Sequence, residues 1–255
     1  MAKAVQRENP LSAPSCSAVR RWLRAERIKP WRYHSWQHVM DPCFQERAIP
    51  VLERYENAVA LLGDDVWVVC VDEKTSIQAL ERIHPPAPAM PNRPIRVAAH
   101  YIRRGIRHLI GALSVADGKV LGCCRETKRF ADFQAFIEEV LIPEAARRGI
   151  TQIRLILDNG STHAPRQLPD WLAQQRSRWE CDVALYWLPK YASWLDQIEI
   201  WFSILQRKAL TPGHFPSLDA LEQRIMRFID FYNHDAKPIQ WSYTTHELIE
   251  KFGAN

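Results

Sequence analysis

Two short β-prone runs constrain the fold of this chain most strongly, because each has the length of a strand and each stops at an aspartate. Residues 66–71, VWVVCV, precede Asp72, and residues 153–157, IRLIL, precede Asp158. Runs of this kind, with little apolar and polar alternation, are typical of strands that are buried on both faces. The sequence therefore predicts a covered sheet in which two strands end in carboxylates.

The pattern between and after these runs predicts the rest of the main domain. A loop with five prolines covers residues 84–94. Beyond it we expect three short strands, near 95–102, 107–115 and 119–124. A helix over 130–148 follows, which Gly149 ends. The remaining expected elements are a helix over 167–179, a strand over 184–189 and helices over 193–210 and 217–234. This order predicts the fold class α/β, as a mixed sheet flanked by helices.

The N-terminal segment has a different character. Residues 15–29 predict a basic helix that begins after a serine cap and stops before Pro30. We expect a linker over 30–45 and a helix over 46–62 that Pro50 interrupts. A helix-turn-helix needs further helices upstream, where only fourteen residues stand, so residues 1–45 are interpreted as an incomplete DNA-binding head with its linker. Residues 46–255 form the main domain.

Composition and charge limit the classes of partner that the chain is expected to bind. Hydrophobic residues make up 47% of the chain and charged residues 25%, as in ordinary globular proteins. The absence of a long apolar run and of a signal peptide predicts a cytoplasmic protein without a membrane partner. Residues 91–130 hold nine Lys and Arg against two acidic residues. Such zoned charge favours a polyanion such as DNA as partner, although a solvated basic face would look the same.

The two aspartates at the strand ends suggest a metal-binding site. In open α/β sheets, ligands bind beyond the carboxyl ends of the strands, so Asp72 and Asp158 are expected to converge. Each alone could instead cap a turn. Two carboxylates that lie close together repel each other unless a cation or proton lies between them, and oxygen ligands select Mg²⁺ or Mn²⁺. No G-x-x-x-x-G-K-[ST] loop and no G-x-S-x-G elbow is present, which disfavours ATP use and serine hydrolysis.

A third acid is sought in the segment SWLDQIEIWFSILQRKAL, residues 193–210. Read as one helix, this segment is apolar over most of its surface and carries a narrow stripe with Asp196 and Glu199 at positions i and i+3. The stripe favours a helix that lines a cleft. The alternative is a partly exposed helix whose acids pair with neighbouring cations such as Arg207.

The three segments VDEKTSIQALERIHP, LILDNGSTHAP and PKYASWLDQIEIWFSILQRKAL resemble, in this order, the signature blocks of the mariner-like insertion-sequence transposases. The resemblance covers most of residues 66–235. It implies an RNase H-like catalytic domain in which Asp72, Asp158 and Glu199 form a metal-binding DDE triad. Asp196 stands where the family more often has asparagine, and is interpreted as a supporting neighbour. The spacing from Asp158 to Glu199 is a few residues longer than in the family.

The implied activity is DNA transposition. Three carboxylates with two Mg²⁺ or Mn²⁺ ions suit phosphodiester cleavage and strand transfer at the ends of an insertion sequence, carried out on double-stranded DNA by a homodimer in the synaptic complex. Two alternatives remain: an inactive transposase-derived DNA-binding protein, and an RNase H-like nuclease without strand transfer. Further candidate residues support the metal shell or contact DNA (Lys74, Asn159, His163) or bind the DNA backbone (Arg20, Arg21, Arg24, Arg103, Arg104, Arg107).

Overall fold

The computed structural model describes residues 14–27 and 41–252, and the chain divides into two compact units, Met1–His38 and Val39–Asn255. In the first unit, helix α2 (Cys16–Ala25) begins where the Ser15 side chain accepts a hydrogen bond from the Ala18 N–H at 3.1 Å. The expected basic helix therefore forms, and it ends at Ala25 rather than at residue 29. Residues 30–40, which make up most of the expected linker, lie outside the described residues.

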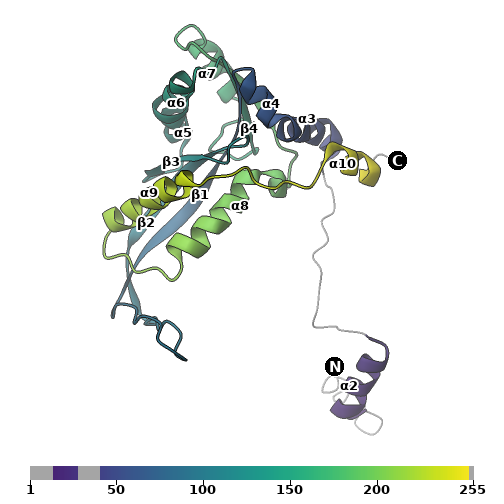
Figure 1. Cartoon of the computed structure of the whole chain (residues 1–255), viewed down its shortest axis with the longest axis vertical. Helices are drawn as coiled ribbons and strands as arrows, with labels where there is room; N and C mark the ends of the chain where they lie inside the picture. The colour runs from purple at the N-terminus through teal and green to yellow at the C-terminus, as the bar shows by residue number, and fades with distance from the viewer. Residues whose placement is uncertain (1–13, 28–40, 253–255) are drawn as a thin grey trace. The chain divides into compact units, whose positions relative to one another are not determined.

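The second unit is built on one mixed sheet of five strands (Figure 1). Its spatial order is β3-β2-β1-β4-β5, with β1 antiparallel to β2 and parallel to β4. The other two pairs are β2 with β3, antiparallel, and β4 with β5, parallel. The strands are β1 (Val66–Arg82), β2 (Tyr101–Ser114), β3 (Val120–Arg125), β4 (Gln152–Leu157) and β5 (Asp182–Trp187). The predicted α/β class with a mixed sheet is confirmed.

Helices cover both faces of this sheet, and each face has its own core (Figure 1). Alternate residues of β1 pack into different cores. Val68 and Cys70 belong to one core, and Val69 and Val71 belong to the other. This explains the unbroken apolar run, since neither face of the strand meets water. The first core contains α3 (Phe44–Glu56), α4 (Ala58–Gly63), α8 (Gln197–Leu205), α9 (Leu218–His234) and α10 (Thr245–Phe252); the second contains α5 (Phe130–Phe136), α6 (Ile142–Arg148) and α7 (Leu168–Gln175).

Two strands, β1 and β2, differ from expectation. β1 does not stop near Asp72 but continues to Arg82, paired with β2 across irregular registers. The strand expected near 95–102 does not form by itself, because β2 begins only at Tyr101 and the preceding proline-rich segment holds just two isolated bridges. Proline lacks the N–H that a strand ladder needs, so the segment rich in prolines stays irregular.

Two helix predictions also need correction. Pro50 lies inside α3 and does not interrupt it; the break before α4 comes at Asn57 instead. The helix expected over 130–148 forms as α5 and α6 joined by a π-helical turn, Ile137–Leu141, and Gly149 ends it with a positive φ of 70°. Within residues 14–27 and 41–252, no helix combines the length and apolar character required to cross a membrane.

Candidate active site

The register of the two central parallel strands places the strand-end aspartates side by side. Cys70 of β1 pairs with Ile156 of β4, and continuing this register by two residues sets Asp72 beside Asp158. Each aspartate lies two residues beyond its neighbour in this pair, Cys70 or Ile156, so its side chain points to the same face of the sheet. That face carries the core that includes α8. Ligand atoms of Asp72, Asp158 and His163 all lie within 4.8 Å of one another. The structure thus brings together both aspartates and one further sequence-predicted residue.

Asp158 is fixed through one of its two oxygens. Its Oδ1 accepts a hydrogen bond from the Gly160 N–H at 2.7 Å and lies 2.7 Å from Nδ1 of His163. The His163 ring is buried and packs edge-on against Phe133. Because Oδ1 already has two partners, Oδ2 is the oxygen of Asp158 that remains available to a ligand.

His163 in turn contacts a carboxylate that sequence reasoning missed. Its Nε2 lies 3.3 Å from Oε2 of Glu73, and the other oxygen of Glu73 accepts a hydrogen bond from the Thr162 hydroxyl at 2.5 Å. Thr162 and Glu73 stand 89 positions apart in the chain. The adjacency of Glu73 to Asp72 in the sequence was the available signal, but alternation along a strand places neighbours on opposite faces, so it did not predict this contact.

The electrostatics of the site separate the two aspartates. Burial, together with the charges of Asp196 and Asp158, raises the pKa of Asp72 to about 8. Burial also acts to raise the pKa of Asp158, but the hydrogen bond and charge of His163 and the Gly160 N–H outweigh it and lower that pKa. Burial acts to lower the pKa of His163, and the contacts with Asp158 and Glu73 overcome it and raise that pKa.

The segment 193–210 is not one continuous helix, contrary to expectation. A 3₁₀ turn, Ser193–Leu195, leads to Asp196, whose extended backbone breaks the run before α8. The Asp196 side chain caps α8 by accepting a hydrogen bond from the Ile198 N–H at 3.2 Å. After α8 the last residues form a π-helical turn, Gln206–Leu210. An aspartate followed three residues later by glutamate is a helix-start pattern, and this signal could have located the break.

The two acids of this segment have opposite environments. Asp196 is only 1% exposed, and its Oδ2 has no hydrogen-bond partner among the described residues. Its charge helps to raise the pKa of Asp72, so the Asp196 carboxylate is close to the site. Glu199 lies in the first turn of α8 and is exposed. Asp196 is therefore an electrostatic neighbour of Asp72, whereas Glu199 is outside the group formed by Asp72, Asp158 and His163.

Two features hold α8 in its place against the sheet. The Tyr55 hydroxyl donates to the Leu195 carbonyl at 2.9 Å and contacts the Cys70 sulfur at 3.2 Å, which braces the turn before Asp196. Gly111 pairs with Asp72 across the β1–β2 ladder. A Cβ at Gly111 would lie 3.1 Å from the side chains of Ile198 and Phe202, so the glycine permits α8 to approach the strand that carries Asp72.

The donor set fits a divalent cation. The site offers Oδ2 of Asp158 and the carboxylate of Asp72, with the charge of the buried Asp196 nearby. Neighbouring carboxylates whose mutual repulsion raises a pKa are relieved by a cation between them. Hard oxygen donors of this kind suit Mg²⁺ or Mn²⁺.

A family comparison agrees with this geometry. Residues 67–222 match the family described as DDE superfamily endonuclease. The chain belongs to this family. No curated protein matches the chain in sequence.

Solved structures share the fold of this DDE endonuclease. It is similar to the Mos1 transposase paired-end complex with left transposon end (TM-score 0.60), to the Mos1 mariner paired-end complex with Mg (TM-score 0.58) and to the same complex with Mn (TM-score 0.57). Each is 18% identical, and the match covers 99% of this chain and 75% of the other. The expected RNase H-like fold is thereby confirmed, and the family match confirms the expected DDE superfamily endonuclease domain.

Other residues expected at the site of this DDE endonuclease have varied surroundings. Asn159 donates from Nδ2 to the Leu188 carbonyl at 2.6 Å, which ties the end of β4 to the end of β5. Lys74 is half-buried and forms no ion pair within the part of the chain that the structure describes.

The arginines expected to bind DNA divide into exposed side chains and side chains that pair with carboxylates. Arg20, Arg21 and Arg24 are exposed on α2, and Arg103 is exposed on β2. Arg104 pairs with Glu81 at 2.5 Å, and Arg107, only 14% exposed, pairs with Glu222 and Glu126. Arg107 is therefore engaged with carboxylates rather than open to a phosphate.

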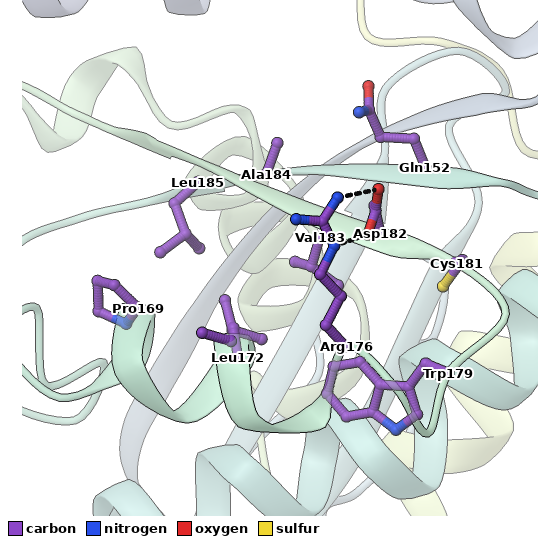
Figure 2. Close-up of a pocket in the computed structure, with 11 residues that line it drawn as sticks. Gln152, Pro169, Leu172, Arg176, Trp179, Cys181, Asp182, Val183, Ala184 and Leu185 are labelled. Atoms are coloured by element: carbon purple, nitrogen blue, oxygen red, sulfur yellow. Dashed lines mark hydrogen bonds and ion pairs between the residues drawn. The ribbon is translucent and has the colours of Figure 1, made fainter.

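A cavity of about 650 Å³ lies elsewhere in the endonuclease, between α7 and the edge strand β5 (Figure 2). Its lining includes Gln152 and Asp182, the first residues of β4 and β5, whereas Asp158 follows the last residue of β4. Its one carboxylate, Asp182, is held by Arg176 at 2.9 and 3.0 Å. This cavity is therefore separate from the cluster of acids.

Proposed function

We propose that this chain is a DNA transposase that cleaves phosphodiester bonds and joins DNA ends, with Asp72, Asp158 and Glu199 as its metal-binding triad. The convergence of Asp72 and Asp158 at adjacent strand ends of a DDE-family domain carries the proposal. Glu199 follows from the family pattern and from its place in the first turn of α8, three residues after the buried Asp196.

The residues of the chain have distinct tasks in this proposal. When bound, two Mg²⁺ or Mn²⁺ ions would activate a water or a DNA 3′-hydroxyl and stabilise the leaving 3′ oxygen. Asp72 and Asp158 would hold the ions, and Glu199 would complete the set. His163 and the Gly160 N–H occupy one oxygen of Asp158, which orients the other. The Asp196 cap and the close approach permitted by Gly111 fix the first turn of α8.

The partners follow from the same assignment. We propose double-stranded DNA as substrate, both as the ends of an insertion sequence and as target, and a homodimer in the synaptic complex. Mos1 transposase, which shares the fold, forms a paired-end complex with a transposon end. Residues 1–45 would act as a DNA-binding head and linker, and residues 46–255 as the catalytic domain. Exposed arginines, Arg20, Arg21 and Arg24 on α2 and Arg103 on β2, would contact the DNA backbone.

Cleavage and joining assays test the proposal. The protein is incubated with supercoiled plasmid and with a duplex that ends in a 3′-hydroxyl, in the presence of Mg²⁺, Mn²⁺ or a chelator. We expect nicking and joining with either metal and none with the chelator. Glu199→Gln should abolish both reactions while DNA binding, measured by fluorescence anisotropy, persists. Glu250→Gln, an exposed change on α10, is the matched control.

The outcomes separate the alternatives. Full activity of Glu199→Gln, or activity with metal chelated, would show the triad assignment to be wrong. Nicking without joining would favour a nuclease that lacks strand transfer. Binding without any reaction in either metal would favour an inactive DNA-binding protein.

A further inference from the structure

A second cavity, of about 430 Å³, lies at the far end of the segment that begins with α8. Its walls come from Ala209 in the π-helical turn, from the loop that contains His214, and from α9. Arg224 and Arg227 line it from α9, and no carboxylate is among its lining residues. A cavity with two guanidinium groups and no acid favours an anionic ligand.

Backbone hydrogen bonds orient two side chains of this cavity, Arg224 and His214. Nε of Arg224 donates to the Ala209 carbonyl at 3.3 Å, which leaves the terminal nitrogens of its guanidinium group for another acceptor. Nδ1 of His214 accepts a hydrogen bond from the Arg82 N–H at 3.0 Å, so the neutral ring carries its proton on Nε2. Within residues 14–27 and 41–252, neither Arg224 nor Arg227 takes part in an ion pair.

The loop itself is anchored to the sheet. The Phe215 N–H donates to the Leu80 carbonyl at 2.9 Å, Nε of Arg82 donates to the Gly213 carbonyl at 3.1 Å, and Phe215 is buried. These contacts fix the loop relative to β1, the strand that also carries Asp72. Fixed donors bind a phosphate with little loss of conformational entropy.

The distance between this cavity and Asp196 determines how long a duplex must be to reach both. Thirteen residues of mostly helical chain separate Asp196 from Ala209, and at 1.5 Å per residue this is about 20 Å. B-DNA advances 3.4 Å per base pair along each strand, so about six base pairs span that distance. We propose that this cavity binds a backbone phosphate of the substrate duplex, roughly six base pairs from the bond that is cut. This inference rests on the proposed DNA-cleaving function.

Duplexes of graded length test the assignment. DNA that extends 4 or 12 base pairs beyond the cleavage point, on each side in turn, is bound to wild type, to the double variant Arg224→Ala/Arg227→Ala, and to Arg178→Ala, which removes one charge elsewhere. On the side that reaches the cavity, we expect the double variant to lose about tenfold in affinity for the 12-base-pair flank and nothing for the 4-base-pair flank. The slope of log K against log salt should fall by about one to two. Arg224→Lys/Arg227→Lys should retain part of the affinity.

Each contrary result is informative. Equal losses for both flank lengths, or affinity no different from Arg178→Ala, would overturn the assignment and leave the cleavage activity standing. Submillimolar binding of inorganic phosphate alone, lost in the double variant without any effect on long duplexes, would overturn it in favour of a free anion. A wild type that binds no duplex of either length would overturn the proposed function and this inference together.

Discussion

Nδ1 of His163 lies 2.7 Å from Oδ1 of Asp158, while Nε2 of the same ring faces Glu73 at 3.3 Å. The imidazole therefore connects a proposed metal ligand to a second carboxylate that has no place in the DDE pattern. Mutation of a partner that orients a ligand in this way typically lowers metal affinity by about 10- to 100-fold. Glu73 and His163 are thus positioning residues for Asp158.

The first prediction concerns Glu73. Glu73→Ala removes the acceptor of the Thr162 hydroxyl and the partner of His163, and should lower the affinity for Mn²⁺ by about 10- to 100-fold. Glu73→Gln keeps an acceptor for Thr162 and should lose less. Mn²⁺ titration followed by electron paramagnetic resonance measures the affinity, with thermal unfolding as a check on folding. Glu81→Ala, on the same strand, is the control; unchanged Mn²⁺ affinity in Glu73→Ala would contradict the prediction.

The second prediction concerns pH. In the folded, metal-free protein the pKa of Asp72 is about 8, against an ordinary value of 3.8. Between these values the folded state keeps a proton that the unfolded chain releases, so the Asp72 contribution to stability declines as pH rises from about 4 to 8. Asp72→Asn should remove this decline. Urea unfolding at pH 5, 6.5 and 8 with a chelator measures it, and identical pH dependence in both proteins would refute the prediction.

The third prediction separates two roles of Asp196. Burial raises the pKa of Asp196, so its ionised form is disfavoured in the folded protein relative to the unfolded chain at neutral pH. Asp196→Asn removes that penalty and keeps a good helix cap, so it should stabilise the metal-free protein. Asp196→Ala loses the cap of α8 and should fall below Asp196→Asn by about 1 kcal/mol. Urea unfolding with a chelator compares them.

Activity completes the test of Asp196. If Asp196 is a supporting neighbour, Asp196→Asn should retain metal-dependent cleavage under conditions in which Glu199→Gln has none. Loss of cleavage in Asp196→Asn at unchanged stability would instead make Asp196 a ligand of the metal.

The two aspartates of the site could be predicted from the sequence because each follows a buried strand. The burial of β1 and β4 on both faces left apolar runs, interrupted in β4 only by Arg154, and the ends of these runs located Asp72 and Asp158. The break at Asp196 was hidden because apolar residues continue across it: Leu195 before it and Ile198 after it are both fully buried. Hydrophobic periodicity records burial, and here capping chemistry, not burial, decides where the helix begins.

Contacts between distant positions were beyond sequence reasoning. Thr162 reaches Glu73 across 89 positions, and Tyr55 reaches Leu195 across 140. Both depend on the packing of the sheet against its helices, and no local propensity encodes them. The length of β1 beyond Asp72 was missed for a related reason, since its outer part is exposed at several positions and no longer shows an unbroken apolar run.

The last prediction uses two glycines that face each other across the β2–β3 ladder, Gly111 and Gly122. A Cβ at Gly111 would crowd Ile198 and Phe202 of α8, and a Cβ at Gly122 would crowd Ile229 of α9 at 3.0 Å. Gly111→Ala and Gly122→Ala should each cost about 1–3 kcal/mol of stability through overpacking. Only α8 carries a proposed catalytic residue, so Gly111→Ala should slow DNA cleavage further, since small misplacements of such groups are costly. Single-turnover cleavage and urea unfolding of both variants measure this, and equal rates at equal stability would count against the positioning of Glu199 by α8.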